Sequence, residues 1–113
     1  MSTEIGRQAE KIAADYLKKQ GFKILQQNWR TRWCEIDIVA SRAKALLFVE
    51  VKYRVNTIHG TGFDYITPQK LRQMQFAAEF WLAQYGVEAD CRLAAIELTG
   101  QPPQVTQWLP DVS

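Results

Sequence analysis

The stretch LLFVEVKY, residues 46–53, includes most of the longest apolar run of the chain, which extends from Ala45 to Val49. A short, uninterrupted apolar run is typical of a strand that is buried on both faces of a sheet. Side chains alternate along a strand, so Glu50 and Lys52 project together on one face. Burying these charges costs several kcal/mol each unless they are paired, bind a ligand or open into a cleft. We therefore predict a central strand that ends in a charged site.

A second acidic residue interrupts the preceding apolar segment, where Asp37 stands between Ile36 and Ile38. If the two strands are neighbours, Asp37 meets Glu50. These two carboxylates, the carbonyl of Val51 and water would supply the oxygen ligands that Mg²⁺ prefers, and Mn²⁺ is a possible substitute. Lys52 would then position a water molecule or stabilise developing negative charge, as phosphodiester hydrolysis requires. The alternative is a structural ion pair between Lys52 and one of the carboxylates.

The rest of the chain predicts alternating helices and strands. The expected elements are a helix from Ile5 to Gly21, strands at 22–29, 34–40, 46–53 and 91–98, a helix from Thr67 to Gly86, and a short strand or edge segment at 105–109. Loops are expected at 41–44 and, unusually long, at 54–66. The order α-β-β-β-α-β, with a possible extra C-terminal strand, favours a mixed central sheet flanked by helices in one α/β domain, residues 1–113.

Composition excludes several classes of protein. The 113 residues are 47% hydrophobic, which suffices for one compact core, and the net charge of +2 predicts no overall positive field. Neither an apolar signal core nor a run long enough to span a membrane is present, so we expect a cytoplasmic protein with no membrane partner. Cys34 and Cys91 match neither a redox pair nor a zinc series and are expected to be buried, reduced thiols.

The charged pattern also carries a family resemblance. The arrangement Asp37-x12-Glu50-Val51-Lys52 resembles the signature of the PD-(D/E)XK nuclease superfamily. Nearly the whole chain, from about residue 6 to 98, resembles the YraN-like family of uncharacterised bacterial proteins, on the motifs Gly6-x3-Glu10, Asn28, Glu35-Ile36-Asp37, Phe48-Val49-Glu50-Val51-Lys52-x-Arg54 and Lys70. Similar arrangements occur in archaeal Holliday junction resolvases.

This resemblance implies a restriction-endonuclease-like core and a metal-dependent nuclease acting on nucleic acid, expected to be DNA, including branched or repair intermediates. It also implies that Glu10 supplies an additional carboxylate near the metal, although a surface Glu paired with a Lys one turn away is an equal alternative. Many such nucleases are symmetric dimers, so a homodimer is possible.

Further polar residues lie near the predicted site in the sequence and are candidates for phosphate contacts: Arg30, Arg32, Arg54, Gln69 and Lys70. Lys70 falls in the first turn of its helix, where backbone amides favour anions. His59, the single histidine, is more typical of a surface residue than of a ligand.

Two other functions remain open at this stage. The first is a nucleic-acid-binding module that keeps the nuclease fold without catalysis. The second is a protein-interaction adaptor that uses residues 105–109 to extend a partner's sheet.

Overall fold

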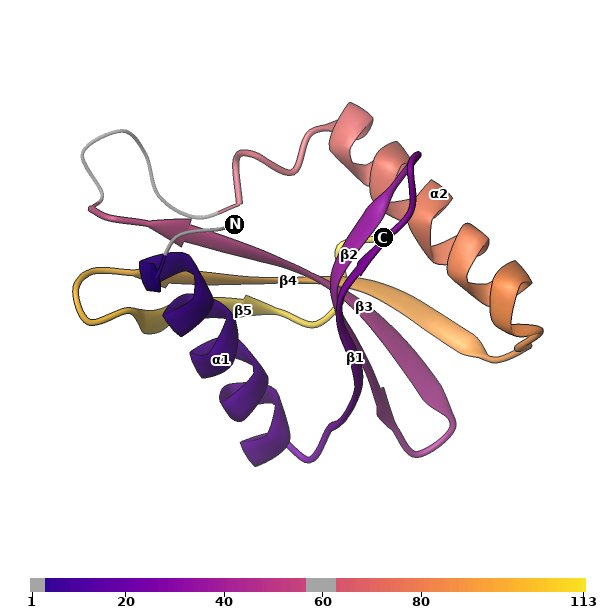
Figure 1. Ribbon diagram of the computed structural model, residues 1–113, viewed down its shortest axis with the longest axis horizontal. Helices are drawn as coiled ribbons and strands as arrows, with labels where there is room; N and C mark the ends of the chain where they lie inside the picture. The colour runs from indigo at the N-terminus through magenta and orange to yellow at the C-terminus, as the bar shows by residue number, and fades with distance from the viewer. Residues whose placement is uncertain (1–3, 57–62) are drawn as a thin grey trace.

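The computed structural model describes residues 4–56 and 63–113. Its elements, in chain order, are α1 (Glu4–Lys19), β1 (Lys23–Arg30), β2 (Glu35–Arg42), β3 (Ala45–Arg54), α2 (Pro68–Tyr85), β4 (Asp90–Thr99) and β5 (Gln104–Leu109) (Figure 1). The order α-β-β-β-α-β with an extra C-terminal strand is therefore confirmed. Residues 57–62, which include Gly60, Gly62 and His59 of the predicted loop, lie outside the described residues.

The sheet is mixed and has the strand order β1-β2-β3-β4-β5. Among the strand pairs of the described residues, only β3 and β4 run parallel, and these are the two strands joined by the crossover through α2. The predicted central strand is confirmed, since β3 lies between β2 and β4 and its residues Leu46 to Val49 are buried.

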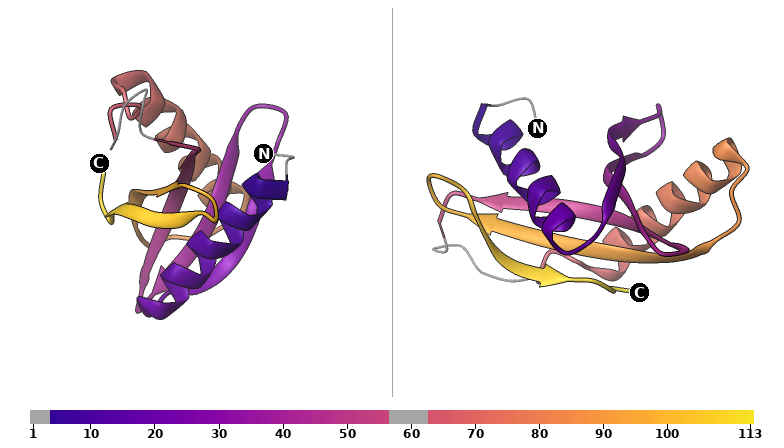
Figure 2. Two further views of the ribbon diagram at one scale, coloured as in Figure 1. Left: turned by 90° about the vertical axis from the view of Figure 1, so that its left-hand side faces the viewer. Right: turned by 90° about the horizontal axis from the view of Figure 1, so that it is seen from below.

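The two helices pack against opposite faces of β3. Ala9, Ala13 and Leu17 of α1 belong to the apolar cluster that contains Leu47 and Val49. Ala77, Ala78 and Trp81 of α2 belong to a second cluster with Leu46 and Phe48. Alternation along β3 places these two sets of strand residues on different faces, and the helices lie well apart with strands passing between them (Figure 2). The sheet is thus flanked by helices, as predicted.

The second helix begins and ends where its sequence indicates. The Thr67 hydroxyl accepts a hydrogen bond from the backbone N–H of Lys70 at 3.1 Å, and Pro68 occupies the first turn. At the other end Gly86 has φ +63°, and its N–H donates to the carbonyl of Leu82. This left-handed conformation is readily adopted by glycine.

Two local predictions are wrong. The loop expected at 41–44 is shorter, because β2 continues to Arg42 and β3 starts at Ala45, with Ala43 at φ +55° in the intervening turn. Cys91 is exposed rather than buried, because it lies near the start of β4, before the core-facing part of that strand; Cys34 is half-buried, and both thiols are free.

The site is created where β2 separates from β3. Regular pairing runs from Arg42↔Ala45 to Ile38↔Val49 and then stops. Beyond it, the Asp37 carboxylate accepts a hydrogen bond from the backbone N–H of Val51 at 2.7 Å, in place of a backbone partner on β2. The two strands therefore diverge at Asp37, and the end of β3 is open to side chains.

Within the described residues, neither helix has the length and apolar character needed to cross a membrane.

Candidate functional site

Asp37 and Glu50 meet at the split between β2 and β3. Burial, followed by the negative charge of Glu50, raises the pKa of the Asp37 carboxyl from 3.8 to about 7, and the charge of Glu10 adds to the effect. The hydrogen bond from Val51 acts in the opposite direction. The predicted neighbourhood of these carboxylates is thus present. A pair of carboxylates that repel one another in a partly buried site is suited to a bound cation.

The backbone of Val51 contributes to the same opening. In a strand the N–H and C=O of one residue point to the same side, and the Val51 N–H points to Asp37. The Val51 carbonyl therefore also faces the gap left by β2. Asp37, Glu50 and this carbonyl are hard oxygen donors of the kind that Mg²⁺ accepts, so the donor chemistry fits a divalent cation.

Glu10 is placed on α1 and is 7% exposed. Its burial places it on the core-facing side of α1, and its charge is the smallest contribution to the raised pKa of Asp37. Across residues 4–56 and 63–113, however, no group of three or more His, Cys, Asp or Glu side chains has the arrangement of a metal cluster. A direct metal contact for Glu10 stays a prediction.

Lys52 lies on the same strand, under an aromatic ring. Its Nζ is 5.4 Å from the centre of the Tyr65 ring. The hydroxyl of Tyr65 is buried and has no hydrogen-bond partner among residues 4–56 and 63–113. Burial and the charge of Glu50 raise the pKa of Tyr65, which is therefore a neutral hydroxyl group next to the site.

Lys70 reaches the site from the first turn of α2. Its Nζ is 2.6 Å from the Glu50 carboxylate, and both side chains are partly exposed. The predicted proximity of Lys70 to the site is present, although the ammonium is paired with Glu50. The backbone amide of Lys70 already bonds Thr67, so this amide is not available to an anion.

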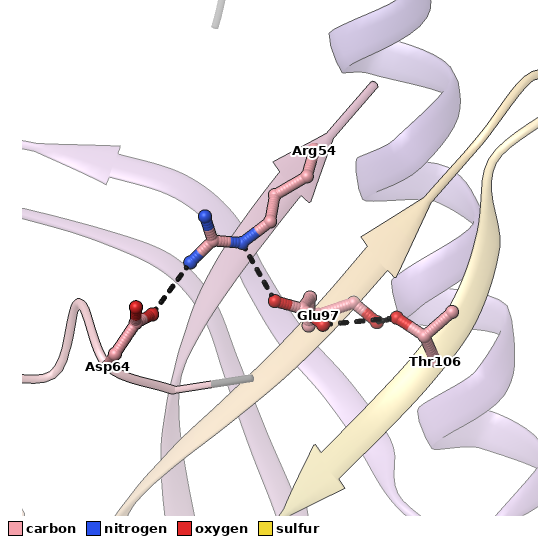
Figure 3. A network of polar contacts seen from close by, with 4 residues as sticks. All are labelled: Arg54, Asp64, Glu97 and Thr106. Carbon is pink, nitrogen blue, oxygen red and sulfur yellow. Dashed lines mark hydrogen bonds and ion pairs between the residues drawn. The ribbon is translucent and has the colours of Figure 1, made fainter. Parts of the chain in front are cut away.

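Arg54 occupies a different place from the one expected for a phosphate-binding residue. Its guanidinium, with a side chain 16% exposed, lies 2.9 Å from Glu97 and 3.1 Å from Asp64 (Figure 3). Thr106 of β5 donates to the other Glu97 oxygen at 3.3 Å. Glu97 is 2% exposed, and a buried carboxylate of this kind requires such partners. Arg54 thus joins β3 to β4 and to the segment leading into α2.

Arg30 and Arg32 lie at the connection between β1 and β2. Arg30 is 3.4 Å from Glu35, and Arg32 lies over the Trp33 ring at 5.4 Å. This connection is beside α2, since the Trp33 ring lies 5.8 Å from that of Phe80, and a cavity of about 520 Å³ is lined by residues of both segments. Gln69, Lys70 and Glu50 line this cavity, so Gln69 and Lys70 lie next to the carboxylate as predicted, whereas Arg54 does not line it.

Glu97 and Tyr65 are two residues at or near the site for which the sequence predicted no role. Glu97 interrupts the apolar run Ala94-Ala95-Ile96, which is the same signal that identified Asp37. Tyr65 gave no such signal, because its placement over Lys52 depends on how the chain returns from β3 to α2.

A five-stranded mixed sheet flanked by two helices, with acidic and basic side chains at the end of its central strand, is compatible with a nuclease-like fold. The chain belongs to the uncharacterised protein family UPF0102, whose family model matches residues 9–98. This confirms the resemblance to the YraN-like family.

Curated relatives agree with this assignment. A UPF0102 protein of Chlorobium chlorochromatii is 43% identical over 93 residues, covering 82% of this chain and 72% of the relative. One from Chromohalobacter salexigens is 33% identical over 105 residues, covering 92% and 85% of the two chains. Another from Mycolicibacterium vanbaalenii is 41% identical over 81 residues, with coverages of 72% and 67%.

Proposed function

We propose that this protein is a divalent-cation-dependent nuclease that hydrolyses phosphodiester bonds, with DNA as the expected substrate. The observation that carries the proposal is the meeting of Asp37 and Glu50 where β2 leaves β3, with the pKa of Asp37 raised to about 7. The Asp37 carboxyl is buried beside the Glu50 carboxylate, whose negative charge contributes to the raised pKa of Asp37. Two neighbouring carboxylates at one opening offer a divalent cation the oxygen ligands that it prefers.

The residues have distinct roles in this proposal. Asp37, Glu50 and the Val51 carbonyl would hold Mg²⁺, or Mn²⁺ in its place. A divalent ion held by these residues would supply Lewis-acid chemistry, lowering the pKa of a bound water molecule and offsetting phosphate charge. Lys52, held beside the Tyr65 ring, orients the attacking water or stabilises the charge that develops on phosphate oxygens. The Lys70 ammonium pairs with Glu50 in the free protein. When the substrate enters, it would leave this carboxylate and pair with a phosphate oxygen instead.

Purified protein, incubated with linear, flapped and four-way-junction nucleic acids in the presence of Mg²⁺ or Mn²⁺, tests the proposal. We expect cleavage of at least one substrate and loss of cleavage with a chelator. Glu50→Gln and Lys52→Ala should each abolish turnover while far-UV circular dichroism stays unchanged. Glu79→Gln is the matched control, since Glu79 is an exposed acid on α2 that does not line the cavity beside Glu50. Undiminished cleavage by Glu50→Gln would contradict the proposal.

The second candidate is a binding module without catalysis, and the contact between Lys70 and Glu50 is the observation that favours it. An ammonium 2.6 Å from the carboxylate competes with a metal ion for the same oxygen. For such a module we expect nucleic-acid binding that Glu50→Gln leaves unchanged, together with no cleavage of any substrate. Cleavage that depends on Glu50 would exclude this candidate.

A further inference from the structure

The cavity beside Glu50 continues into an aromatic surface. It is bounded by Trp33 and Cys34 from the β1–β2 connection, by Glu35 at the start of β2, and by side chains from the first half of α2, which include Lys70, Arg72 and Phe76. Trp33 is 66% exposed and Phe76 is 51% exposed, which is unusual for such large apolar side chains. Both line the cavity that Glu50 also lines, so the aromatic groups and the proposed site share one opening.

These aromatic rings are held in place from behind. The ring of Phe80 lies 5.8 Å from that of Trp33 and 6.1 Å from that of Phe76. Phe80 also contacts the buried Trp29, with ring centres 5.9 Å apart. The exposed rings are thus supported by the core rather than displayed on a free loop. A rigid, exposed aromatic face loses little entropy when a flat ligand stacks on it.

Positive charge surrounds the same opening. Arg32 lies over the Trp33 ring, and Lys70 and Arg72 line the cavity. The carboxylates at this place, Glu35 and Glu50, are each within ion-pair distance of a cation, Arg30 and Lys70 respectively. Basic side chains interleaved with exposed aromatic rings are typical of surfaces that bind single-stranded nucleic acid.

We propose that this groove binds an unpaired nucleic-acid strand, with bases stacked on Trp33 and Phe76 and phosphates at Arg32, Arg72 and Lys70. In a duplex the base faces are already stacked on one another, so only an unpaired strand offers them to the two rings. The inference rests on the proposed function and specifies its substrate: the bond to be cleaved lies in, or next to, a single-stranded segment that enters beside Glu50.

Binding measured with a chelator present tests the inference independently of catalysis. Fluorescence anisotropy would compare a labelled oligothymidylate, an oligouridylate, the matching DNA duplex and a DNA strand of the same length with abasic sites. We expect the two base-containing single strands to bind more tightly than the duplex and the abasic strand. The ratio between oligothymidylate and oligouridylate distinguishes DNA from RNA as the source of the strand.

Substitutions in the groove supply the second part of the test. We expect Trp33→Ala to weaken oligothymidylate binding about five- to 100-fold, the range that loss of one base stack produces. Phe76→Ala should act in the same direction, and Trp33→Phe should restore most of the affinity. Tyr85→Ala, which removes an exposed ring at the other end of α2, is the matched control and should leave binding unchanged.

Equal affinity for duplex and single strand, or an unchanged affinity in Trp33→Ala, would overturn the inference. So would a dimer, seen by sedimentation, that Trp33→Ala dissociates, because a second copy would then cover the groove. The two proposals fail separately. Single-strand binding through Trp33 without cleavage in Mg²⁺ contradicts only the nuclease, whereas cleavage that Trp33→Ala and Phe76→Ala leave unaffected contradicts only the groove.

Discussion

Replacing Asp37 by Asn should stabilise the protein at neutral and alkaline pH. The carboxyl of Asp37 is unfavourably placed for ionisation, since burial and Glu50 raise its pKa from 3.8 to about 7. Asn has nearly the same shape and retains an oxygen that can accept the Val51 N–H. The substitution therefore removes the charge with little change in packing.

The magnitude follows from the difference between the two pKa values. Between pH 4 and 7 the folded protein retains a proton on Asp37 that the unfolded chain has released, so the free energy of unfolding of the wild type falls as the pH rises. At about 1.4 kcal/mol per pKa unit, the loss approaches about 4 kcal/mol above pH 7. Asp37→Asn lacks this dependence, so its advantage over the wild type should be largest above pH 7 and vanish near pH 4.

Urea unfolding of both proteins at pH values from 4 to 8, without divalent cations, measures this difference. Glu35→Gln is the control, because its exposed ion pair with Arg30 should change stability by less than about 1 kcal/mol at any pH. Mg²⁺ added at pH 8 should stabilise the wild type but not Asp37→Asn. An Asn variant that is less stable than the wild type at pH 8, or a difference that does not vary with pH, would refute the reasoning.

Three further substitutions test the surroundings of the site. Tyr65→Phe removes a buried hydroxyl that has no partner in the part of the chain that the structure describes. It should raise the free energy of unfolding, measured with urea, by about 1 kcal/mol; a decrease would show that the hydroxyl is satisfied. Glu97→Ala leaves Arg54 without its buried partner and should cost about 3 kcal/mol by the same measurement, with a cost below about 1 kcal/mol contradicting the importance of the pair. Lys70→Met removes the ammonium next to Glu50 and should tighten Mn²⁺ binding in calorimetry; weaker binding would argue against competition between the two cations.

The sequence predicts the elements well wherever local chemistry determines them. Thr67 and Pro68 begin α2 and Gly86 ends it, because capping and a left-handed terminator are properties of single residues. The position of β3 follows from its unbroken apolar run, which only a central strand can bury on both faces.

The arrangement of the site was less accessible, because it depends on contacts between distant residues. Strand alternation placed Glu50 and Lys52 together, but the divergence of β2 at Asp37 and the contact of Lys70 with Glu50 arise from the packing of separate elements. Arg54 looked like a phosphate-binding residue because its partner Glu97 is 43 residues away in the sequence. Asp37 and Glu97 are both carboxylates within apolar strands, but Asp37 lies at the candidate site and Glu97 forms a buried ion pair. The sequence pattern alone therefore does not distinguish a functional carboxylate from a structural one.

Cleavage in water enriched with heavy oxygen tests the central claim most directly. The protein would be incubated with Mg²⁺ and an oligonucleotide substrate that carries a duplex, a single-stranded flap and the junction between them, and the products analysed by mass spectrometry. Hydrolysis at the Asp37–Glu50–Lys52 site predicts one heavy oxygen in each newly formed terminal phosphate, no product in the presence of a chelator, and no product from Glu50→Gln. An intact oligonucleotide with the wild type, or the same labelled products from Glu50→Gln, would contradict the account.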